Sequence, residues 1–185
     1  LHLFRAESPG PTAGKMMPKV RDSVQNIYII YLVLSALCLA MLLFGGMPVF
    51  DSFCTMFGIA GTGGFGVRGD GMASYSPYLQ TVCTVFMLLF GVSFVQYIVL
   101  LRGGVKAVLK DEELRWYGAI VAVAVGVITG MLVFSGFGGF GKSLHNAGFM
   151  VASVITSTGL STGDYSGWPA LTRAILFLLL VVGAM

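Results

Sequence analysis

Two short polar turns contain the residues of this 185-residue sequence that are best suited to chemistry. The first Gly turn, residues 61–66, reads Gly-Thr-Gly-Gly-Phe-Gly, and the second Gly turn, residues 156–162, reads Thr-Ser-Thr-Gly-Leu-Ser-Thr. Glycine tolerates positive φ and lets backbones approach closely. Backbone carbonyl oxygens can replace the hydration shell of a monovalent cation without burying a compensating charge. We therefore expect a cation site in which Gly64 and Gly159 hold equivalent positions.

The expected ligands are backbone oxygens from four residues of each turn, with the carbonyls of Gly64 and Gly159 contacting the ion. These residues are Thr62, Gly63, Gly64, Phe65, Ser157, Thr158, Gly159 and Leu160. The alternative is that the glycines only allow helices to pack tightly in lipid. Two such clusters in register favour the cation site. Asp70 and Asp164, which follow the turns, could concentrate cations at an outer mouth, or could be ordinary surface acids.

A short apolar helical pattern precedes each turn, within residues 50–60 and 144–155. About 12 residues of helix cover about 18 Å, whereas the hydrocarbon core of a bilayer is about 30 Å thick. Each segment should therefore enter and leave the membrane on one side, with the negative end of its helix dipole at the turn. We expect Asp51 or Ser52 to cap the first short helix and Asn146 to cap the second.

The composition predicts an all-α polytopic membrane protein. Hydrophobic residues make up 56% of the chain and charged residues only 10%, with a mean hydropathy of +0.88, against about 25% charged residues in soluble domains. Four long apolar windows occur, and the first three are long enough to span a bilayer. They are residues 27–47, 79–101, 117–137 and 170–185.

The remaining side chains argue against an enzyme. The predicted spans lack Asp, Glu and Lys and contain one charged residue, Arg173, so buried groups for acid–base chemistry are missing. Residues 136–143 match a phosphate-loop pattern, but they follow a membrane span and not a β-strand. The three cysteines lie in apolar segments without metal-ligand spacing, which favours plain packing; they are Cys38, Cys54 and Cys83.

The charge distribution predicts the topology, and an internal repeat predicts the domain organisation. Residues 1–24 and 102–116 together carry eight of the eleven Lys and Arg residues, so both loops should be cytoplasmic and both Gly turns exterior. At an offset of 95, Gly64 aligns with Gly159. We expect a complete outer helix–pore loop–inner helix (M1-P-M2) unit over residues 25–101 and a truncated one over residues 117–185, with residues 1–24 as a linker from a preceding unit.

The motifs together resemble the TrkH/TrkG/KtrB potassium-uptake family. The resemblance rests on residues 3–11 (Leu-Phe-Arg-Ala-Glu-Ser-Pro-Gly-Pro), on both Gly turns and on Trp168-Pro169. It implies tandem K⁺-channel-like M1-P-M2 repeats, of which this chain would hold the second and most of the third. Gly64 and Gly159 would then be selectivity-filter glycines.

The same resemblance implies uptake of K⁺, with Na⁺ as the ion of some members, and no covalently bound cofactor. It implies a homodimer in the bacterial inner membrane that binds a cytoplasmic nucleotide-sensing ring subunit similar to TrkA or KtrA, and no nucleic acid. One alternative is a true M1-P-M2 cation channel. The other is a non-transporting membrane scaffold or an intramembrane enzyme.

Overall fold

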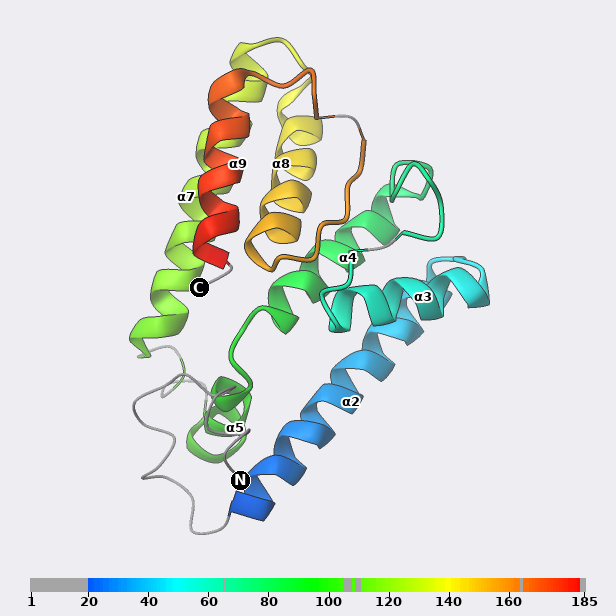
Figure 1. Ribbon diagram of the computed structural model, residues 1–185, viewed down its shortest axis with the longest axis vertical. Coiled ribbons are helices and arrows are strands. Elements are labelled where there is room, and N and C mark those ends of the chain that lie inside the picture. Colours follow the sequence, from blue (N-terminus) through cyan, green and yellow to red (C-terminus); the bar gives the residue numbers. More distant parts are fainter. Residues whose placement is uncertain (1–19, 65, 105–107, 109–110, 164, 184–185) are drawn as a thin grey trace.

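The computed structural model of the chain describes residues 20–64, 66–104, 108, 111–163 and 165–183. These residues form seven helices and no strand. The helices are α2 (Val20–Phe44), α3 (Val49–Ala60), α4 (Pro77–Phe90), α5 (Phe94–Gly103), α7 (Glu112–Phe134), α8 (Phe140–Ile155) and α9 (Ala170–Gly183). In Figure 1, α2, α3 and α4 form one group and α7, α8 and α9 a second group beside it.

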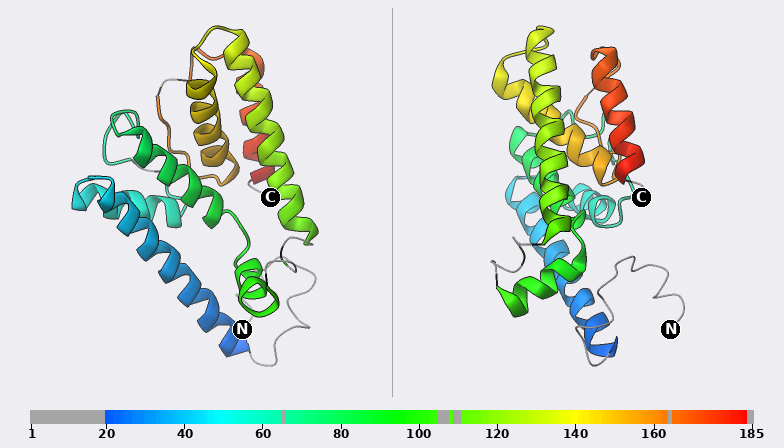
Figure 2. Two further views of the ribbon diagram at one scale, coloured as in Figure 1. Left: turned by 180° about the vertical axis from the view of Figure 1, so that it is seen from behind. Right: turned by 90° about the vertical axis from the view of Figure 1, so that its left-hand side faces the viewer.

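Each group begins with a long apolar helix followed by a short one. Within the described residues, two helical stretches, Val24–Phe44 and Glu112–Phe134, are long and apolar enough to cross a membrane. Each is followed after a brief turn by a short helix, α3 or α8, and then by the inner helix α4 or α9. Figure 2 shows both groups from two further sides, with α8 between α7 and α4.

The short helices begin earlier than the sequence suggested. The N-cap of α3 is Pro48, and Asp51 lies in its first turn, so neither Asp51 nor Ser52 caps the helix. The N-cap of α8 is Gly139, and Asn146 lies inside the helix. The predicted caps were therefore wrong, because proline and glycine define these starts through backbone geometry and no side-chain hydrogen bond is present at either N-cap.

The predicted span over residues 79–101 is broken. It consists of α4 and α5, which meet at an angle of 85° across Gly91, Val92 and Ser93. Two tyrosine hydroxyls stabilise the break by donating to carbonyl oxygens in the last turn of α4, where the regular helical hydrogen bonds end; the Leu89 oxygen also accepts from Val92 N–H at 3.2 Å. Tyr97 donates to the Leu89 oxygen at 2.6 Å and Tyr117 to the Leu88 oxygen at 3.3 Å. Apolar periodicity did not reveal this break because α4 and α5 are both apolar.

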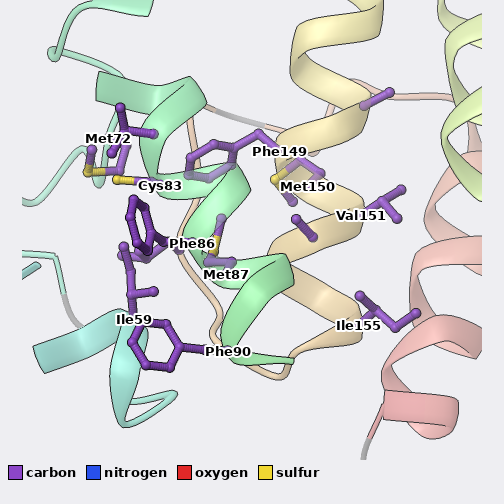
Figure 3. Packing of buried hydrophobic residues seen from close by; sticks show 14 of the residues in the cluster. Ile59, Met72, Cys83, Phe86, Met87, Phe90, Phe149, Met150, Val151 and Ile155 are labelled. Carbon is purple, nitrogen blue, oxygen red and sulfur yellow. The ribbon is translucent and has the colours of Figure 1, made fainter. Parts of the chain in front are cut away.

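The core of the molecule lies where the two groups meet, between α4 and α8. Figure 3 shows Phe149 of α8 directed toward α4, near Cys83 and Phe86. Phe86, Met87 and Phe149 are at most 2% exposed, and Ile59 of α3 lies next to them in the same cluster. In lipid such helix contacts depend on van der Waals packing, so this interface fixes the position of α8, and with it the second Gly turn, relative to the first group.

Candidate cation-binding site

Helices α3 and α8 end in the same backbone motif. At the end of α3, Thr62 N–H donates to the Ile59 oxygen at 3.3 Å, and Gly63 N–H donates to the Gly58 oxygen at 2.8 Å. This pair of bonds is the Schellman arrangement. Both Gly turns therefore leave their helix by one geometry, which the sequence repeat alone could not establish.

The end of α8 repeats these bonds at the equivalent positions. Ser157 N–H donates to the Val154 oxygen at 3.0 Å, and Thr158 N–H donates to the Ser153 oxygen at 2.9 Å. The left-handed residue of such a motif is usually glycine. Here it is a hydroxyl residue in both turns, with φ of 50° at Thr62 and 55° at Ser157. A non-glycine residue pays about 1–2 kcal/mol for this conformation, so the surrounding packing must hold each turn in place.

The sign of the φ angle alternates along both Gly turns. The φ angle is positive at Gly64 (69°) and Gly159 (77°) as well as at Thr62 and Ser157, but not at Gly63 or Thr158 between them. Alternating hands place successive N–H groups on one side of a chain, which leaves the carbonyl oxygens on the other. Each turn can thus present a short row of oxygens, the arrangement a dehydrated monovalent cation requires.

The two turns touch at their predicted filter glycines. An added Cβ atom on Gly64 would overlap the carbonyl oxygen of Thr158 and lie 3.6 Å from the Cα atom of Gly159. In return, a Cβ on Gly159 would lie 3.9 Å from the Cα atom of Gly64. Gly64 and Gly159, 95 positions apart in the sequence, are therefore neighbours.

Buried hydroxyls support the second turn, whereas the first has glycines in their place. Thr156 Oγ1 lies 2.8 Å from Thr158 Oγ1 and donates to the Ala152 oxygen at 2.7 Å. Ser153 Oγ donates to the Leu160 oxygen at 2.5 Å, so that carbonyl already has one partner within the protein.

The residues at the matching positions of the first turn are Gly58, Gly61 and Gly63. They offer no side chain that could hold the turn. The first turn must accordingly be held from elsewhere.

The segment that follows the first Gly turn contacts the end of the second Gly turn. Met72 N–H donates to the Ser161 oxygen at 2.8 Å. Gly71, with a φ of 66°, lies so close to Ser161 that an added Cβ would be 2.6 Å from its carbonyl oxygen. These contacts join the exits of the two turns.

The remaining predicted site residues are placed as follows. Thr62 and Gly63 are exposed, Gly64 is partly exposed, and Thr158 and Leu160 are buried. Asp70 is exposed. Phe65 and Asp164 lie outside the described residues.

Sequence reasoning missed a polar cluster at the N-terminal end of α3, the end opposite the first Gly turn. Tyr75 Oη donates to Asp51 Oδ2 at 2.7 Å, and Arg68 Nε lies 3.9 Å from the same oxygen. Gln80 Oε1 lies 2.7 Å from His145 Nε2 and so links α4 to α8. The signal available was Asp51 itself, a charge inside an apolar half-helix.

The fold and the paired turns define a class of protein: a polytopic membrane protein made of units with a long helix, a short re-entrant helix with its turn, and an inner helix. Comparison with known proteins agrees. The chain is 32% identical over 182 residues to the Trk system potassium uptake protein TrkG of Escherichia coli (strain K12). This match covers 96% of this chain and 37% of TrkG. It is 29% identical over 187 residues to TrkH of Salmonella typhimurium, covering 99% of this chain and 39% of that protein.

A solved structure shows the same fold. The crystal structure of the potassium transporter TrkH from Vibrio parahaemolyticus matches with a TM-score of 0.84 and 23% identity, over 96% of this chain and 39% of that chain. No family model matches the sequence. The chain spans about two fifths of the length of these relatives. The chain is similar to that part of the Trk potassium uptake proteins, which confirms both the resemblance drawn from its motifs and the expected fold class.

Proposed function

We propose that this chain is part of a membrane subunit for potassium uptake, in which K⁺ crosses the bilayer through a constriction lined by backbone carbonyls. The observation that carries the proposal is the contact between Gly64 and the Thr158–Gly159 backbone, at turns of alternating hand. The Trk names of the relatives support K⁺ as the transported ion.

The geometry favours ion transfer through coordination by neutral oxygens. The Gly turns consist of Gly, Thr, Ser, Phe and Leu, so the oxygens that they can offer are backbone carbonyls and hydroxyls. The ends of α3 and α8 also direct the negative ends of two helix dipoles toward the turns. A row of neutral oxygens together with this field suits a monovalent cation that must bind and leave again.

Within this proposal, residues 25–101 and 117–185 are two repeats around one pore, with the ion ligands being Thr62, Gly63, Gly64, Phe65, Ser157, Thr158, Gly159 and Leu160. Asp70 and Asp164 would attract cations at the outer mouth. The protein would work as a homodimer in the bacterial inner membrane, with both turns exterior. A nucleotide-binding ring subunit would contact residues 1–24 and 102–116.

The test is Rb⁺ or K⁺ uptake by the full-length parent protein in cells that lack potassium transport. Gly64→Ser and Gly159→Ser should each reduce uptake and change ion selectivity at normal membrane abundance. Gly126→Ser is a matched control, since Gly126 lies in α7 with open space around it. Unchanged uptake and selectivity in both turn variants would refute the site.

A further inference from the structure

Asp51 is a buried acid at the outer end of the first short helix. It is 9% exposed, and its Oδ2 atom accepts a 2.7 Å hydrogen bond from the hydroxyl of Tyr75. A hydrogen bond to an ionised carboxylate is among the stronger kinds in proteins. The position of Asp51 in the first turn of α3 also suits the positive end of the helix dipole.

Arg68 is the weaker partner of this carboxylate. Its Nε atom lies 3.9 Å from Asp51 Oδ2 and its side chain is 45% exposed, so water and salt screen the pair. Its guanidinium lies over the Tyr75 ring, 4.7 Å from the ring centre, and donates to Ser74 Oγ at 3.1 Å. The hydrogen bond from Tyr75 is therefore the main contact that Asp51 makes.

Tyr75 also joins Asp51 to the second group of helices. Gln80 Nε2 donates to the carbonyl oxygens of Met72 (2.9 Å) and Tyr75 (3.2 Å). With its amide hydrogens directed to these carbonyls, Gln80 Oε1 accepts from His145 Nε2 of α8 at 2.7 Å. Asp51 is thus linked to His145 through the side chain and backbone of Tyr75 and the side chain of Gln80.

These hydrogen bonds hold the far end of the segment that follows the first Gly turn. The segment from Gly64 to Tyr75 is held at one end by α3 and at the other by the contacts of Met72 and Tyr75. The first turn lacks the hydroxyl side chains that support the second. Its geometry must then depend on how the far end of the segment is held.

We propose that Asp51 is a positioning residue for the first Gly turn, which it holds through Tyr75, and that the affinity and selectivity of cation binding depend on this contact. The inference rests on the proposed function. Asp51 itself contacts no ion; it sets the distance between the carbonyl row of residues 62–64 and that of the second turn. A small change in this distance alters binding because ion coordination depends on how closely the oxygens approach.

The test compares Tyr75→Phe, Asp51→Ala and Asp51→Asn in the full-length parent protein. Tyr75→Phe removes one hydroxyl, and Asp51→Ala removes its acceptor. Each should raise the half-saturating Rb⁺ concentration by about threefold to tenfold, the effect of losing one hydrogen bond, and should increase Na⁺ uptake relative to Rb⁺. Asp51→Asn keeps an oxygen that can accept from Tyr75, so it should restore most of the wild-type behaviour.

The control is Tyr78→Phe, a change to a nearby tyrosine that is 47% exposed, which should leave both readings unchanged. Uptake is normalised to the amount of protein in the membrane. Wild-type affinity and selectivity in Tyr75→Phe would overturn the inference, even if Asp51→Ala fails to fold. A wild-type parent that moves neither Rb⁺ nor K⁺ would overturn the proposed function, and this inference with it.

Discussion

The Cα atom of Gly64 lies against the carbonyl oxygen of Thr158, so closely that a Cβ atom at position 64 would overlap that oxygen. The contact joins two turns that belong to different helix groups and that repeat one backbone geometry. Gly64 therefore meets two requirements together, a positive φ and a close backbone approach. Gly159 meets the first requirement, but a Cβ atom added there would lie 3.9 Å from its nearest neighbour, the Cα atom of Gly64.

We predict that Gly64→Ala impairs uptake more than Gly159→Ala. Alanine at position 159 meets only the cost of positive φ, about 1–2 kcal/mol, whereas alanine at position 64 must also displace the backbone of the second turn. Rb⁺ uptake per transporter, with the thermal unfolding midpoint in detergent, measures both effects. Equal losses in the two variants would contradict the close approach at Gly64.

A second prediction concerns the crossing between the turns. Gly71→Ala should lower the unfolding midpoint because its Cβ would lie 2.6 Å from the Ser161 oxygen at a φ of 66°. Gly69→Ala, two residues earlier in the same loop, has open space and should be neutral. The expected difference is about 1–3 kcal/mol, the usual cost of forcing atoms into a packed site. If both variants unfold at the same temperature, the contact with Ser161 is not formed.

The fold could be predicted from sequence to the extent that apolar length and repetition determine it. Residues 27–47 and 117–137 predicted the long helices α2 and α7, and the half-length patterns predicted α3 and α8. The break at Gly91 could not be predicted in this way. It depends on Tyr97 and Tyr117, which lie outside α4 and reach its end only after the chain has folded.

The candidate site was predictable in its residue types but not in its supports. The alignment of Gly64 with Gly159 in the internal repeat indicated that the two Gly turns are equivalent. Their contact depends on how the two helix groups pack together, which no local pattern encodes. The sequence predicts a helix cap at Asp51 because a local rule explains an acid near a helix start. Its partner Tyr75 is 24 residues away.

The break between α4 and α5 yields a third prediction. A Cβ on Gly91 would lie 2.7 Å from both Tyr117 Oη and Thr156 Cγ2, so Gly91→Ala should destabilise the protein by about 1–3 kcal/mol. Tyr117→Phe removes one of the two obstacles but also the hydrogen bond to Leu88, which is worth about 1 kcal/mol. The double variant should therefore be less destabilised than the sum of the single variants.

Thermal unfolding of the four proteins in this cycle provides the measurement. Tyr28→Phe, a change to an exposed tyrosine of α2, is the control for loss of a hydroxyl alone. Additive effects of the two substitutions would show that Gly91 and Tyr117 are not in contact. The break would then need another explanation.

The ionisation of Tyr75 gives a fourth prediction, which is independent of transport. Burial, reinforced by the hydrogen bond to Asp51, raises the pKa of Tyr75 from 10.0 to about 12. Because the folded-state pKa is the higher one, the stabilising contribution of Tyr75 is complete below pH 10 and disappears as the pH rises through about 12. Ultraviolet titration of tyrosinate in wild-type protein and Tyr75→Phe should therefore differ by one group that ionises near pH 12. A difference that titrates near pH 10 would contradict both the burial of Tyr75 and its hydrogen bond to Asp51.

The last prediction tests the direction in which the two Gly turns face. Basic residues concentrate in residues 102–116, and positively charged loops stay in the cytoplasm, so Ser74→Cys should react with an impermeant maleimide in intact cells. Glu112→Cys, at the start of α7, should react only after the membrane is permeabilised. The background should lack Cys54, because Cys38 and Cys83 are buried but Cys54 is partly exposed. Labelling of Glu112→Cys in intact cells, with Ser74→Cys protected, would place the turns in the cytoplasm, and the outer-mouth role of Asp70 would have to be abandoned.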